Sequence, residues 1–135
     1  MITQQDLERL DHLRRKEIPR IMDKQYQLQS RVELSSVRLG ESRSSAMRDK
    51  YAEYVADMED LTEKYKALEL EEERMVLEIM RAIRILPGEI SDVIYMRYVQ
   101  RMSFGRIAHE LHQSESTIYR RHRKGLEMLT RTDSN

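Results

Sequence analysis

Basic and hydroxyl side chains near the end of the chain have the types and spacing needed to hold a nucleic-acid backbone and to read base edges. Four basic residues and no acidic residue lie between Ile118 and Lys124. If Ile118 marks the buried side of a helix, Arg120 lies near the centre of the opposite side, where a guanidinium can reach a guanine. The residues expected to contact DNA are Arg106, Glu115, Ser116, Thr117, Arg120, Arg121, Arg123 and Lys124.

These residues divide into different expected contacts. Ser116 and Thr117 at a helix N-terminus donate to a phosphate, and Arg106 reaches the backbone from a preceding helix. Glu115 either accepts from a cytosine or only complements the helix dipole in the first turn. The alternative for the whole set is a solvated helix face without a partner.

Two short helices joined by a tight turn are predicted to position this face. Ser103 is a favourable N-cap, and Met102 before it can pack onto Ile107. The turn follows at 111–114, and Ser114 caps the second helix. Buried positions of the second helix are expected at Ile118, His122, Gly125, Leu126 and Leu129.

The pattern P-x-x-I-x-x-V-I-x-M-R-Y-x-x-x-x-S-F-x-x-I-A-x-E-L-x-x-S-x-S-T-I, which starts at Pro87, resembles region 4 of the sigma-70 family. The resemblance covers about 87–130 and implies a helix-turn-helix that reads promoter DNA. The sequence departs from the family at Arg101 and His112, where glycine is usual, and at Gln113, where an apolar residue is usual. Small phage regulators of the RinA/ArpU kind, with a coiled coil before such a module, are similar to the whole chain.

The resemblance implies double-stranded DNA as the partner, with RNA polymerase as a further partner, and no cofactor. The expected function is sequence-specific DNA binding by an oligomeric phage or prophage transcription regulator. Two alternatives stay open. One is a DNA-packaging terminase small subunit, in which the DNA module usually precedes the coiled coil. The other is a protein that docks on RNA polymerase without reading DNA.

The composition predicts an all-α protein with elongated helices and a thin apolar seam. Charged residues make up 36% of the 135 residues and aromatic residues 6%, with one Phe and no Trp. Eight basic and thirteen acidic residues in 40–89 are followed by eight basic and five acidic residues in 90–135. This asymmetry favours DNA contact through the C-terminal end only.

The N-terminal region is predicted to be a long antiparallel coiled-coil hairpin over residues 1–86, followed by a DNA-binding domain over 87–135. A short helix at 3–16, capped by Thr3, a kink or brief break near Glu17 and Ile18, and a second helix from about Pro19 to 39 come first. A loop at 40–45 leads to a helix at 46–86. Its apolar residues recur at a regular spacing of four and three, which is typical of a coiled coil.

A homo-oligomer, with a dimer favoured, is expected because the shorter helix covers only half of this seam. The uncovered half, 68–86, packs on the N-terminal helix, on the DNA-binding module or on a second copy, and we favour the second copy. The residues expected at the oligomer interface are Tyr51, Tyr54, Met58, Leu61, Tyr65, Leu68, Met75 and Ile79. A further helix at 90–101 and a polar tail from Thr130 to Asn135 complete the prediction.

Enzymatic and metal-binding motifs are not found in the sequence. His109 and His112 lie three residues apart rather than four, so they do not form a zincin motif, and no metal site is expected. His122 is expected to be a packing residue with one hydrogen bond. With no cysteine, no signal peptide and no apolar run of membrane length, we expect a cytoplasmic protein without membrane contact, in the bacterial host if the chain is phage-encoded.

Overall fold

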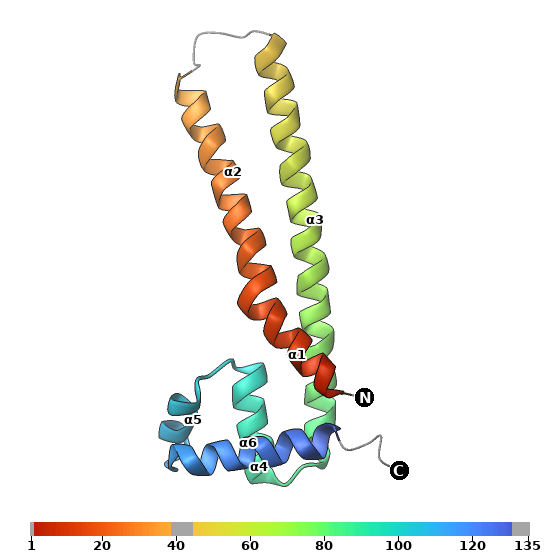
Figure 1. Cartoon of the computed structure of the whole chain (residues 1–135), viewed down its shortest axis with the longest axis vertical. Coiled ribbons are helices and arrows are strands. Elements are labelled where there is room, and N and C mark those ends of the chain that lie inside the picture. The colour runs from red at the N-terminus through yellow and green to blue at the C-terminus, as the bar shows by residue number, and fades with distance from the viewer. Residues whose placement is uncertain (1, 39–44, 131–135) are drawn as a thin grey trace. The chain divides into compact units, whose positions relative to one another are not determined.

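The computed structural model describes residues 2–38 and 45–130, and all of its regular structure is helical. Six α-helices follow in order (Figure 1): α1 (Gln4–His12), α2 (Ile18–Arg38), α3 (Ser45–Ala82), α4 (Gly88–Ile94), α5 (Phe104–Glu110) and α6 (Glu115–Thr130). No strand occurs in this described part, so the prediction of an all-α protein is confirmed. The expected loop at 40–45 and the expected tail lie outside the described residues, except Ser45 and Thr130, which belong to α3 and α6.

The first helix begins at a reciprocal cap, as the sequence predicts for Thr3. The Thr3 N–H donates to Asp6 Oδ2 at 2.9 Å, and the Asp6 N–H donates to Thr3 Oγ1 at 3.2 Å. This arrangement satisfies two N–H groups that a helix start otherwise leaves without partners.

The kink or brief break expected near Ile18 is a π-helical turn, Leu13–Glu17, so the helical backbone continues from α1 into α2. The N–H of Ile18 donates to the carbonyl of Leu13, five residues back. Pro19 follows and has no N–H to donate, and one wider turn lets the chain pass it without ending the helix. Of the two expected alternatives, a break is therefore wrong, and the irregularity at this point is a π-helical turn within a continuous helix.

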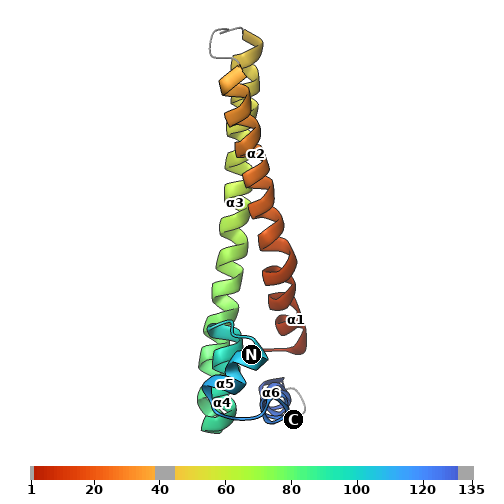
Figure 2. The same ribbon diagram turned by 90° about the vertical axis from the view of Figure 1, so that its left-hand side faces the viewer.

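The contacts of the chain divide it into two units, which are described separately. One unit contains residues 11–71 and the other contains residues 1–10 together with 72–135. In the first unit, Figures 1 and 2 show α2 beside α3 and running in the opposite direction. Leu13 is the only described side chain of this unit that is fully buried. Leu28, Met58 and Leu61 are half-buried, whereas other apolar residues of this unit, such as Tyr26 and Leu70, are exposed.

The second unit has a continuous apolar core that joins segments far apart in the sequence. Nine residues form it: Ile2, Leu7, Leu10, Ile79, Ile83, Leu86, Ile90, Ile94 and Leu129. The end of α3, its 3-10 turn Ile83–Ile85 and the N-terminal helix therefore share one core with α4 and α6. The boundary expected between residues 86 and 87 lies within this unit.

The packing of Ile79 corrects the expectation that a second copy covers the end of the long helix. Ile79 is 1% exposed in the single chain, and Met75 packs against the same core. Within one chain, the N-terminal helix and the segments after Pro87 cover Ile79, Ile83 and Leu86. Leu70 and Leu77 of the same stretch stay exposed, so contact of a second copy with the rest of it stays a prediction. Pattern alone did not separate the three surfaces left open for residues 68–86, because all three would bury the same apolar stripe.

Candidate nucleic-acid interface

α5 and α6 form a helix-turn-helix whose helix starts are capped as predicted. Ser103 Oγ accepts from the N–H of Arg106 at 3.2 Å, which fixes the start of α5. Ser114 Oγ accepts from the N–H of Thr117 at 3.3 Å and lies 2.9 Å from the hydroxyl of that residue. Both caps satisfy N–H groups of a first helical turn, so the two helices begin at defined residues.

The turn between the two helices contains a residue in the left-handed conformation. His112 has φ 54° and directly follows the last turn of α5. Its N–H donates to the carbonyl of His109, and the N–H of Gln113 donates to the carbonyl of Ala108 at 3.0 Å. These two bonds make the Schellman arrangement that commonly ends a helix, usually with glycine at the left-handed position.

A second left-handed residue precedes α5. Arg101, with φ 58°, lies after the π-helical turn Tyr95–Val99. Both positive-φ residues of the described chain thus stand where the sigma-70 family usually has glycine. A side chain other than glycine at such a position costs about 1–2 kcal/mol per residue.

The helix predicted at 90–101 is α4 followed by the π-helical turn. It starts earlier than expected, at Gly88 after Pro87, and its regular α-helical part ends at Ile94. Ile90, Val93 and Ile94 are buried as predicted, whereas Tyr98 is only half-buried.

The inner side of α6 packs tightly on α4 and α5. Ile118 is fully buried with Val93, Ile107 and Ala108 in a second apolar cluster. At Gly125 the approach is closer, since a Cβ atom there would lie 2.8 Å from the side chain of Ile94. The buried contacts at Ile118 and Gly125 fix the rotation of α6 about its own axis. The direction of its outer face is therefore fixed as well.

The outer side of α6 contains most of the residues expected to contact DNA. Ser116, Arg120, Arg123 and Lys124 are exposed, and Thr117 is half-buried beside the Ser114 cap. Glu115 is exposed in the first turn of α6, and Arg106 is exposed on α5. A row of cations with hydroxyl groups at the helix N-terminus can bind phosphates and reach base edges.

Arg121 differs from the other members of this set. Its guanidinium lies 3.6 Å from a carboxylate oxygen of Glu89 on α4, and its side chain is only 20% exposed. The side chain therefore lies against α4 instead of on the outer face. In this position it ties α6 to α4, and the geometry does not favour the expected DNA contact for this residue.

An aromatic cluster, defined here as Arg97, Tyr98, Phe104, Tyr119 and His122, joins α6 to the two preceding segments. The Phe104 ring centroid lies 4.5 Å from that of Tyr119 and 4.9 Å from that of His122. The Arg97 guanidinium lies 4.2 Å above the same ring and donates to the carbonyl of Met102 at 3.0 Å. Such contacts add to burial in orienting a helix.

The sequence pattern did not reveal most of this cluster, because its members come from three segments and follow no single period. His122 was expected to pack and to make one hydrogen bond, and it lies 3.0 Å from the Tyr98 hydroxyl. Burial and the nearby charge of Arg97 lower the pKa of His122 from 6.5 to about 4. The ring is therefore neutral at neutral pH.

The residues expected at the oligomer interface have different surroundings. Tyr51 is 62% exposed, and its ring centroid lies 6.1 Å from that of Tyr54. Met75 and Ile79 belong to the core of the second unit. The half-buried residues between these ends are Tyr54, Met58, Leu61, Tyr65 and Leu68.

The described residues contain neither a group of side chains that could hold a metal ion nor a helix that could span a membrane. No group of three or more His, Cys, Asp or Glu side chains there is arranged to hold a metal ion. No described helix is long and apolar enough to span a membrane.

A comparison with known families gives the bounds of the module that contains the helix-turn-helix. Residues 76–129 match the family model Sigma-70, region 4. The match begins within α3, earlier than the start near residue 87 expected from the motif. The region 4 module thus includes Ile79, Ile83 and Leu86, which share the core with α4 and α6. No curated protein and no solved structure matches the chain.

Proposed function

We propose that the protein is a phage or prophage transcription regulator of the RinA/ArpU kind, which binds double-stranded DNA sequence-specifically as an oligomer. The single observation that carries the DNA-binding part is the outer face of α6. Arg120, Arg123 and Lys124 are exposed there on a helix held by the region 4 core. A helix of this kind enters the major groove with its N-terminal residues near the bases.

In this proposal Arg120 reads a guanine, and Lys124, one turn further along, binds a phosphate. Ser116 and Thr117 donate to a phosphate at the N-terminus of α6, and Arg106 does so from α5. Arg121 supports α6 through Glu89 and makes no contact with a base. No catalytic step, metal or cofactor is needed for this function.

The N-terminal part supplies the oligomer in this proposal. α2 and the first half of α3 pack as an antiparallel coiled-coil hairpin, and two copies place two recognition helices on neighbouring half-sites. A linked second site raises affinity through effective concentration, without any new type of contact. Half-sites about one helical turn apart, or a multiple of that, follow from this arrangement.

Selection of bound sequences from random duplexes by the purified full chain tests the proposal. Enrichment of an inverted repeat, and a footprint on that repeat without RNA polymerase, are the expected results. Selection of no sequence, with a footprint only when polymerase is added, would instead identify a polymerase-docking protein. A closed ring of eight or more copies would favour DNA packaging.

A further inference from the structure

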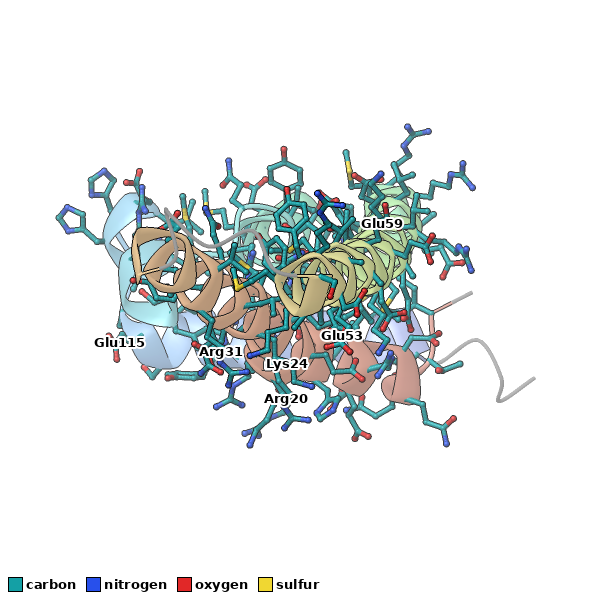
Figure 3. The ribbon with its side chains drawn as sticks, turned by 90° about the horizontal axis from the view of Figure 1, so that it is seen from above. Arg20, Lys24, Arg31, Glu53, Glu59 and Glu115 are labelled. Carbon is teal, nitrogen blue, oxygen red and sulfur yellow. The ribbon has the colours of Figure 1, made fainter. Side chains whose placement is uncertain are left out.

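One side of the first unit has a groove that is lined by two leucines and by polar and charged side chains of opposite sign. The groove lies between α2 and α3, with Leu28 and Leu61 among its lining residues. Lys24 and Arg31 of α2 and Asp57 and Asp60 of α3 also line it, and all four are exposed. Figure 3 shows Arg20, Lys24 and Arg31 pointing to the same side as Glu53, and Glu59 pointing to a different side.

Each helix presents its charges as a continuous stripe. The basic stripe of α2 is Arg20, Lys24, Gln27 and Arg31, and the acidic stripe of α3 is Glu53, Asp57 and Asp60. Their spacing of four and three residues keeps each stripe on one helix face. Among the described residues, no ion pair joins the two stripes, whereas Asp60 pairs with Lys64 of its own helix at 3.2 Å. Most of the opposite charges thus stay available to a partner.

The groove also lacks the burial that a stable helix pair needs. Leu28 and Leu61 are half-buried, and no described side chain in 18–33 or 45–71 is fully buried. Covering these side chains contributes about 25 cal/mol for each Å² of apolar surface removed from water. A partner that covers the groove and matches both stripes therefore gains from apolar burial and from charge.

We propose that the partner on this side is a second copy of the same chain, with the basic stripe of each copy on the acidic stripe of the other. This inference rests on the proposed function, in which the chain acts as an oligomer, and adds the surface that forms it. The oligomer interface then lies at the α2–α3 groove and not at the end of α3, where Ile79 is buried within one chain.

The pattern of charge selects one symmetry. A two-fold axis along the helices places α2 of one copy over α3 of the other, so that unlike charges face each other. An axis across the helices in the same plane would place like charges together. The favoured axis keeps the direction of both α3 helices the same. The acidic stripe also makes this side a poor match for nucleic acid, whose phosphates it repels.

Two charge-reversed variants of the full chain test the interface. Lys24→Glu with Arg31→Glu makes both stripes acidic, and Asp57→Lys with Asp60→Lys makes both basic. Each variant alone should dissociate at least tenfold more readily than the wild type in sedimentation, because like charges then face each other across the axis. An equimolar mixture should restore association as a heterodimer. Circular dichroism verifies that each variant is helical.

A matched control separates the stripe from net charge. Glu59→Lys with Glu69→Lys changes the same number of charges on exposed residues of α3 outside the stripe. This variant should associate like the wild type and should pair with the Lys24→Glu, Arg31→Glu chain more weakly than the Asp57→Lys, Asp60→Lys chain does, because only one of its two stripe contacts then joins unlike charges. Equal pairing of both lysine variants with that chain would overturn the proposal, because charge alone would then explain the association.

Two further outcomes distinguish this inference from the proposed function. Reversed variants that associate like an oligomeric wild type would show that the interface is elsewhere, and the oligomer would stand. A wild type that sediments as a monomer at tens of micromolar, alone and on its selected DNA, would refute the oligomer and this interface together.

Discussion

At the scale of single residues, several positions were predictable because their effect is local. At each of the caps Thr3, Ser103 and Ser114, the side-chain oxygen accepts from an N–H only three residues further along the chain. Gly125 was expected on the buried side of its helix, but the close approach to Ile94 depends on α4 and does not appear in a local pattern. The Arg121–Glu89 pair was missed for the same reason.

Gly125 offers a test of how closely α6 must approach α4. In Gly125→Ala the new methyl would lie 2.8 Å from Ile94 and 2.9 Å from Ile90, so these side chains must move. We expect a loss of about 1–2 kcal/mol in the free energy of unfolding, since overpacking outweighs the helix propensity gained. Gly88→Ala is the control, because no atom lies within 4 Å of its Cβ position. Urea titration measures both, and equal stability of the two variants would contradict this packing.

His122 predicts a pH dependence of stability. Its pKa is lowered to about 4 in the folded chain, below the value of 6.5 that applies when the chain is unfolded. The unfolded state therefore binds more protons between these values, and stability should fall as the pH falls from about 6.5 toward 4. In His122→Leu the free energy of unfolding should change less over this pH range. An unchanged pH profile in the variant would show that other groups cause the dependence.

At the scale of elements, helix type followed from period and composition, whereas helix continuity did not. The sequence predicted a kink or brief break before Pro19 and a regular helix over 90–101, and the structure has a π-helical turn at both places. In such a turn a backbone hydrogen bond joins residues five apart, which adds one residue to the helix. The spacing of the apolar residues changes little, so the sequence pattern does not reveal the turn. The aromatic cluster is a similar case, because three segments must pack before its rings meet.

The turn between α5 and α6 can be tested through its left-handed residue. His112→Gly should raise the free energy of unfolding by about 1 kcal/mol, since glycine adopts positive φ without a Cβ clash. His109→Gly, in the last turn of α5, is the control and should lower stability by about 1 kcal/mol. Thermal or urea unfolding measures both changes. A destabilised His112→Gly chain would mean that the His112 side chain makes a contact that outweighs the strain.

At the scale of the whole molecule, the division into a coiled-coil region over 1–86 and a DNA-binding domain over 87–135 stays a prediction, and the apolar core of the structure crosses the expected boundary. The Pro87–Gly88 pair suggested a domain start, since proline and glycine usually end a helix. The chain does leave α3 there, but the apolar residues before the break pack with those after it. Proline followed by glycine occurs both in linkers between domains and in sharp turns within one core. Only the packing of the flanking apolar residues distinguishes these two cases.

The fragment 87–135 should therefore be much less stable than 72–135, and adding the peptide 1–10 should stabilise the longer fragment further. Without residues 72–86 the short fragment exposes Ile90, Ile94 and Leu129, which are buried in the whole chain. Circular dichroism with thermal unfolding compares the two. A short fragment that unfolds at the same temperature as the longer one would restore the boundary at residue 87.

The central claim, that the outer face of α6 reads DNA, is tested most directly by binding titrations at several salt concentrations on selected and scrambled duplexes. For Arg120→Ala we expect a loss of about 1–3 kcal/mol on the selected site, relaxed base preference at one position of each half-site, and little change in salt slope. For Lys124→Ala we expect weaker binding to both duplexes and a salt slope smaller by about one unit for each copy. If Arg120→Ala weakens both duplexes equally, Arg120 binds a phosphate and the proposed orientation of α6 in the groove is wrong.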